Sequence, residues 1–218
     1  MSWVTTEVAG KPVATFAPPD ARFTVLFLND HHQEQPTHND ELTTALLTHS
    51  LKCVAPWGGA WWANRIDPAF DEHVTPEQHL FHLLTPSPPH PLAAIGGQAA
   101  LRLGFKYPDR FPVVAGWDAA IDFHDWHGRG TSLDAVYERK EQARQDTAVL
   151  HVRQNQFPPH VWFGCPPESE WFRGNDRLHE KLSAVGVLHT FVTEQDRPWA
   201  TLTAFVADAL ARQSRRLL

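Results

Sequence analysis

The sequence predicts a single α/β domain in which helices cover both faces of a mostly parallel central sheet. Short apolar runs rich in β-branched and aromatic residues alternate with helical patterns along the chain, as they do in βαβ units. Hydrophobic residues make up 42% of the chain and charged residues 20%, which are ordinary values for a globular protein. A chain of 218 residues buries about 70% of its unfolded surface, so one core suffices without disulfides or metals.

The elements alternate in order from residue 23 onwards. Residues 23–28 (FTVLFL) form an apolar run typical of a strand buried on both faces, and the helix expected at 40–50 begins with acidic residues. The next buried strand is expected at 53–55, and Pro76 is expected in the first turn of a helix that ends near Leu84. Further strands are predicted at 92–95, 111–116, 161–165 and 187–192, and further helices at 98–106, 132–137, 140–150, 171–184 and 199–212. The segment 117–159 is expected to be an insertion, and neither a repeat nor a long linker divides residues 1–218.

Charge and cysteine content narrow the class of function. Lys and Arg number 19 against 25 Asp and Glu, and the net charge of −6 argues against a general nucleic-acid binder or a polybasic membrane-surface protein. The start MSWVTTEVAG lacks the features of a secretory signal, and the apolar stretch 92–103 is too short and too polar to span a membrane. Cys53 and Cys165 are too few for a disulfide framework. We therefore expect a cytoplasmic protein without a cofactor, whose partner is an unidentified small molecule or protein. The sequence leaves open whether the chain forms a homodimer.

Several segments resemble one family of enzymes. The run AIGGQAALRL at 94–103, followed by KYPDRF at 106–111, resembles the nucleophile elbow and the next helix of α/β-hydrolases. It is most similar to esterase-D-like and S-formylglutathione-hydrolase-like esterases, whose elbow reads G-x-S-x-G-G. Other segments resemble a bacterial group of these esterases in the same order, namely 56–59 with Trp61 and Trp62, 120–130, and 171–180. The resemblance covers most of the chain and implies the α/β-hydrolase fold, with its site at the carboxyl ends of the strands.

The catalytic residues of that family do not carry over to this chain. The elbow serine position falls on Ala94 and the first elbow glycine on Leu92, so no side-chain oxygen stands at the nucleophile position. The family's histidine precedes a Trp after the last strand, and that position falls on Arg197, which cannot act as a general base near neutral pH. The acid position falls on Glu168, with Glu170 as the alternative register. A Glu168–Arg197 ion pair is therefore expected; otherwise Arg197 faces solvent or an anionic ligand.

The predicted function is that of an esterase homologue that has lost serine hydrolysis and binds a small molecule or a protein. In the oxyanion loop, the carboxylate of Asp30 would repel a developing oxyanion. Tryptophans on loops beside the carboxyl edge of a sheet commonly form the walls of ligand pockets. The candidate ligand-binding residues are Asn29, Asp30, Ile95, Trp57, Trp61, Trp62, Trp117 and Arg197.

The alternative is a hydrolase that uses a non-standard Asp/His or metal-assisted site, with groups such as Asp30, His31 and Asp118. The spacing of the histidines in this region matches no established metal motif. The candidate metal ligands are His31, His32 and His38. A second cluster is expected to have a structural or pocket-edge role, and it comprises Asp118, Asp122, His124, Asp125 and His127. Cys165 is expected to be a buried packing residue rather than a substitute nucleophile.

Overall fold

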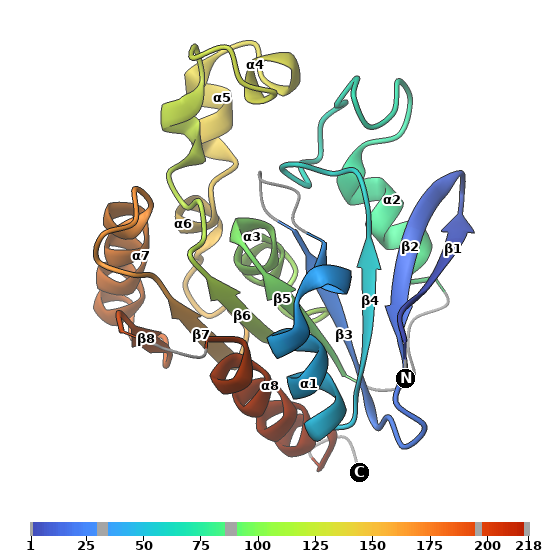
Figure 1. The fold of residues 1–218 in the computed structure, drawn as a ribbon. Helices are drawn as coiled ribbons and strands as arrows, with labels where there is room; N and C mark the ends of the chain where they lie inside the picture. The colour runs from blue at the N-terminus through green and yellow to red at the C-terminus, as the bar shows by residue number, and fades with distance from the viewer. Residues whose placement is uncertain (1, 30–34, 86–90, 195–197, 216–218) are drawn as a thin grey trace.

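In the described residues, eight strands form one sheet in the order β1-β2-β4-β3-β5-β6-β7-β8 (Figure 1). The computed structural model describes residues 2–29, 35–85, 91–194 and 198–215. β2 pairs antiparallel with both β1 and β4, whereas all other neighbours in the sheet are parallel, as the sequence predicts. The strands are β1 Val4–Val8, β2 Lys11–Phe16, β3 Phe23–Leu28, β4 Leu51–Pro56, β5 Leu92–Gly96, β6 Val113–Trp117, β7 His160–Gly164 and β8 Thr190–Val192.

Helices cover both faces of this sheet. α1 (Asp40–Thr48) and α8 (Pro198–Arg215) pack on one face, and α3 (Gln98–Lys106) and α7 (Phe172–Ala184) pack on the other (Figure 1). Alternate residues of each central strand enter opposite cores, so both faces are buried and the strands read as continuous apolar runs. The remaining helices are η1 Pro36–His38, α2 Pro76–Leu83, η2 Phe123–Trp126, α4 Leu133–Val136, α5 Lys140–Gln145 and α6 Ala148–His151.

Local sequence signals account for the starts of the helices. The Asn39 side chain accepts a hydrogen bond from the Leu42 N–H (2.8 Å) and caps α1. Thr75 and Gln78 form a capping box at the start of α2, where Pro76 occupies the first turn. Within the described part of the chain, no helix is long and apolar enough to cross a membrane.

Three predictions of secondary structure are corrected. The hairpin of β1 and β2 is missing from the sequence-based prediction. β1 has no buried residue and therefore no apolar pattern, whereas β2 does bury residues on both sides of the strand. The helix predicted at 140–150 is broken into α5 and α6, since Thr147 has extended backbone (φ −73°, ψ 151°) and the Asp146 carboxylate turns to Arg102. The strand predicted at 187–192 is confined to 190–192, because the Val187 carbonyl accepts a hydrogen bond from the His189 ring instead of a strand neighbour.

The segment between β6 and β7 carries η2, α4, α5 and α6. α4 and α5 lie above the carboxyl ends of the strands, whereas α6 lies beside α3 (Figure 1). A separate apolar cluster joins this insertion to the loop after β4 and to the start of α7. Its largest side chains are Trp61, Phe123, Tyr137 and Trp171. The space above this part of the sheet edge is therefore filled by the chain's own aromatic residues.

A buried ionic network fastens the insertion to α2 and α3. The Arg102 side chain is 1% exposed, and its guanidinium forms ion pairs with Glu77 (2.6 Å) and Asp146 (2.5 Å). Burial opposes ionisation of Asp146, but its hydrogen bonds and the charge of Arg102 hold the pKa of this carboxyl well below its usual range. The other side chains that donate hydrogen bonds to these two carboxylates include Lys106, Tyr107 and Tyr137.

Candidate functional site

The turn between β5 and α3 lies at Gly96 and Gly97, where a serine hydrolase of this topology would hold its nucleophile. Gly96 has a φ of +129°, which side chains rarely tolerate. A Cβ on Gly96 would lie only 2.1 Å from the backbone oxygen of Leu28 at the end of β3. The turn is therefore closed against β3 and has no room for a side chain.

Ala94 lies inside β5, two residues before this turn. It pairs with Leu26 on β3 and with Val114 on β6, and it is fully buried. The residue at the turn itself is Gly96. Neither position carries a side-chain oxygen, so the chemical consequence is the same whichever of the two is matched to the family's serine.

One backbone donor of an oxyanion hole is also engaged. In α/β-hydrolases this hole consists of the N–H after the nucleophile and an N–H from the loop after β3. Here the Gly97 N–H donates a hydrogen bond to the Leu28 carbonyl (3.2 Å). The Asn29 carbonyl accepts a hydrogen bond from the indole of Trp62 (3.2 Å), and Asp30 lies outside the described residues. The Gly97 N–H, which would be one of the two oxyanion donors, is thus engaged by a contact within the chain.

Two of the tryptophans predicted to bind a ligand fill the space beside the elbow. Trp62 is fully buried, with φ +50°. Trp61 is also buried; its indole donates a hydrogen bond to the Ser132 hydroxyl (3.1 Å), and its carbonyl accepts one from the Gln98 side chain (2.8 Å). Both rings are therefore held by hydrogen bonds inside the protein.

Of the predicted ligand-binding residues that the structure describes, Asn29 and Trp62 are in contact, whereas the others belong to different apolar clusters. Trp57, Trp117 and Ile95 belong to the core on the α1 and α8 side, where Trp117 stacks on Trp162 with ring centroids 6.3 Å apart. Trp61 and Trp62 belong to two other apolar clusters. Arg197 lies outside the described residues, so the Glu168–Arg197 pair remains a prediction.

At the ends of β6 and β7, the structure reveals a polar group that sequence reasoning did not assemble. The Asp118 Oδ1 atom accepts hydrogen bonds from the Ser169 hydroxyl (2.5 Å) and from the Cys165 thiol (3.2 Å). Asp118 also has a left-handed backbone, with φ +47°. Asp118 follows β6, and Cys165 and Ser169 follow the neighbouring parallel strand β7. Because the carboxyl ends of parallel strands meet at one edge of a sheet, this order is the only signal in the sequence that predicts the contact.

The two residues considered for the acid position lie in different surroundings. Glu170 accepts a hydrogen bond from the Trp126 indole (3.2 Å), whereas Glu168 is exposed.

Both cysteines are expected to resist alkylation in the folded protein. Burial and the hydrogen bond to Asp118 raise the pKa of Cys165 to about 12, and burial raises the pKa of Cys53 as well. The thiolate is the reactive form, so almost none is present at pH 7. Iodoacetamide at pH 7, followed by mass spectrometry, should modify neither residue in buffer and both in guanidinium chloride. Modification of native Cys165 at the rate of a free thiol would show that this thiol is accessible and that its pKa is not raised.

The second acidic and histidine cluster forms contacts that hold the insertion together. Asp122 pairs with Arg177 (2.9 Å) and Asp125 pairs with Lys140 (2.7 Å). The His127 ring contacts the Tyr137 carbonyl (2.8 Å), and His124 is buried, which lowers its pKa.

Among the residues that the structure describes, no three His, Cys, Asp or Glu side chains are placed to hold a metal ion. Of the candidate metal ligands, His38 lies in η1, whereas His31 and His32 lie outside the described residues.

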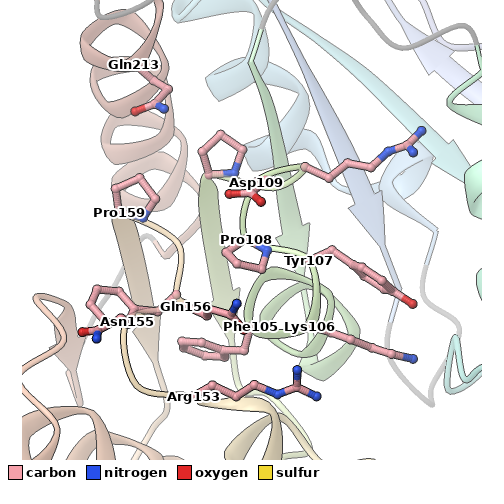
Figure 2. A pocket seen from close by; sticks show the side chains of 13 residues that line it. Phe105, Lys106, Tyr107, Pro108, Asp109, Arg153, Asn155, Gln156, Pro159 and Gln213 are labelled. Atoms are coloured by element: carbon pink, nitrogen blue, oxygen red, sulfur yellow. The ribbon is translucent and has the colours of Figure 1, made fainter.

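A cavity of about 690 Å³ lies at the opposite edge of the sheet, below the C-terminal end of α3. Figure 2 shows it between the turn that follows Phe105, the loop at Arg153 and Asn155, and Gln213 on α8. The Lys106 and Tyr107 side chains point away from Gln213 and Pro159 (Figure 2), and both donate hydrogen bonds to Glu77. This cavity lies beside the C-terminal end of α3, away from the turn at Gly96 and Gly97 that precedes that helix.

Comparisons with known proteins agree with this topology. No protein-family model matches the sequence, and no curated protein matches it significantly. Among solved structures, an S-formylglutathione hydrolase from Agrobacterium tumefaciens aligns over 99% of this chain and 95% of its own, with 13% identity and a TM-score of 0.71. The S-formylglutathione hydrolase FrmB from Staphylococcus aureus aligns over 98% of both chains, with 10% identity and a TM-score of 0.73. FphF, a fluorophosphonate-binding serine hydrolase from Staphylococcus aureus, aligns over 97% of both chains, with 12% identity and a TM-score of 0.72. The chain therefore has the α/β-hydrolase fold, in the form found in esterases and S-formylglutathione hydrolases.

Proposed function

We propose that this chain binds a small molecule or a protein and does not hydrolyse esters through a serine nucleophile. The closed elbow is the observation that supports this proposal most directly. A serine mechanism needs a side-chain oxygen at the turn after β5 and free N–H groups that stabilise the oxyanion. In this chain, a Cβ at Gly96 would meet the Leu28 carbonyl, and the same carbonyl accepts the hydrogen bond of Gly97.

Purified protein is expected neither to hydrolyse p-nitrophenyl acetate or butyrate nor to react with a fluorophosphonate probe. The reason is the absence of an elbow nucleophile, whose removal costs a serine hydrolase about 10⁶-fold in kcat. Release of p-nitrophenol and in-gel fluorescence of the probe measure the two outcomes. FphF serves as the positive control, because it binds fluorophosphonates.

Ser169→Ala is the matched variant for this experiment. Ser169 is half-buried and donates its hydroxyl hydrogen bond to Asp118. Hydrolysis and labelling by the wild-type protein, both lost in Ser169→Ala, would show a serine site at Ser169 and overturn the proposal. Labelling that survives in Ser169→Ala would overturn it as well, and would place the nucleophile elsewhere.

Hydrolysis at a non-standard site is the alternative function, and the geometry of Asp118 favours it. A left-handed backbone at a residue other than glycine is strained, and such strain is concentrated at functional sites. The Asp118 carboxylate also lies at the sheet edge where this fold places its chemistry. The other groups named for this alternative, Asp30 and His31, lie outside the described residues. Turnover of esters without fluorophosphonate labelling would favour this alternative over the proposed function.

A further inference from the structure

A small cavity of about 300 Å³ lies between the insertion and the first turn of α7. Trp126 from η2 and Trp171 before α7 line it, with ring centroids 5.0 Å apart. Trp126 also packs edge-on against Trp61 (6.4 Å), so the cavity borders the aromatic cluster at the carboxyl edge of the sheet. Its size is at the lower end of the range for small-molecule sites.

The acidic side chains in this cavity already have donors. Asp122 pairs with Arg177 (2.9 Å), and Asp125 pairs with Lys140 (2.7 Å), so these two charges are neutralised. Glu170 accepts a hydrogen bond from the Trp126 indole (3.2 Å) but keeps its negative charge.

The cavity is also lined by two arginines, which differ from Asp122 and Asp125 in having no ion-pair partner in the described part of the chain. Arg129 and Arg173 line it and are exposed, and neither forms an ion pair with any residue that the structure describes. Arg129 also lies close enough to Asp125 to help lower the pKa of that carboxyl. Counting Arg177 and Lys140 from the two ion pairs, four cations therefore surround the three carboxylates. The cavity has an excess of one positive charge beside aromatic rings.

We propose that this cavity binds a small aromatic monocarboxylate. One negative charge balances the excess positive charge, and the planar guanidinium fork matches the geometry of a carboxylate. Trp126 supplies aromatic surface for the ring of the ligand, and the buried Trp171 packs against Trp126. This inference rests on the proposed binding function and adds a ligand class to it. The two are tested separately, because hydrolysis is measured with esters and binding with a free acid.

Benzoate is the probe for this site, and NMR of the tryptophan indole N–H groups is the measurement. Benzoate is expected to shift the Trp126 indole signal, assigned with Trp126→Phe, in a saturable manner. Benzamide, which is uncharged, and acetate, which lacks the ring, should each bind at least about tenfold more weakly. Arg173→Gln and Arg129→Gln should each weaken benzoate binding to a similar extent. Both arginines are exposed, so the variants are expected to fold, and their spectra check this directly.

Arg153→Gln is the matched control, since Arg153 is an exposed arginine in the cavity at the opposite edge of the sheet. It should bind benzoate as the wild-type protein does. The inference is wrong if benzoate causes no saturable shift, if benzamide or acetate binds as tightly, or if both Arg173→Gln and Arg129→Gln bind as well as Arg153→Gln.

Discussion

Replacing Arg102 with Met is expected to lower the free energy of unfolding by about 3–5 kcal/mol. The Arg102 and Glu77 side chains are 1% and 2% exposed and form an ion pair at 2.6 Å. Removing the guanidinium leaves buried carboxylates at Glu77 and Asp146 without their main cationic partner. Unfolding in guanidinium chloride, followed by circular dichroism, measures the change.

Arg144→Met is the control for this experiment. Arg144 forms an ion pair of similar length with Glu141 (2.7 Å), but both side chains are largely exposed. Solvent screens such a pair, so its removal should leave the unfolding midpoint unchanged within error. Equal effects of Arg102→Met and Arg144→Met would show that the buried network does not stabilise the fold.

Replacing Gly96 with Ala is expected to destabilise the protein by about 3 kcal/mol or more. The backbone at Gly96 has φ +129°, and the added Cβ would lie 2.1 Å from the Leu28 backbone oxygen. A backbone atom cannot rotate away as a flexible side chain can, so β3 or β5 must move. The midpoint of chemical unfolding and the recovery of folded protein report this effect.

Gly186→Ala separates the clash from the backbone strain. Gly186 also has a positive φ of +75°, but a Cβ there would meet no atom within 4 Å. Its replacement should therefore cost only the left-handed strain, about 1–2 kcal/mol. If Gly96→Ala is no less stable than Gly186→Ala, the elbow is open, and the main support for the proposed function is lost.

Most of the central fold could be predicted, because its strands are buried on both faces and appear in the sequence as continuous apolar runs. α3 was predicted at its observed bounds, since Gly96 and Gly97 mark its start and Pro108 follows its end. The edge strand β1 gave no such signal because it buries none of its side chains. The break between α5 and α6 depends on the distant Arg102, which no local pattern encodes.

Less of the candidate site could be predicted. The absence of an elbow serine was evident from the sequence, but the position of the turn depends on the register in which Gly96 faces Leu28. The expected tryptophan wall is dispersed because each ring packs in the nearest apolar cluster. Asp118 and Ser169 are 51 residues apart, so their contact follows only from the order of β6 and β7 in the sheet.

The buried network also has a consequence for motion. Asp146 stands at the break between α5 and α6, and its carboxylate is fastened to Arg102 on α3. Lifting the insertion from the sheet edge would break the ion pair that holds Asp146 against Arg102 on α3. We therefore expect the insertion to move together with α3 rather than as an independent lid. Binding at the part of this edge that the insertion borders would then need no opening step of the insertion, and encounter and fit would set the association rate there.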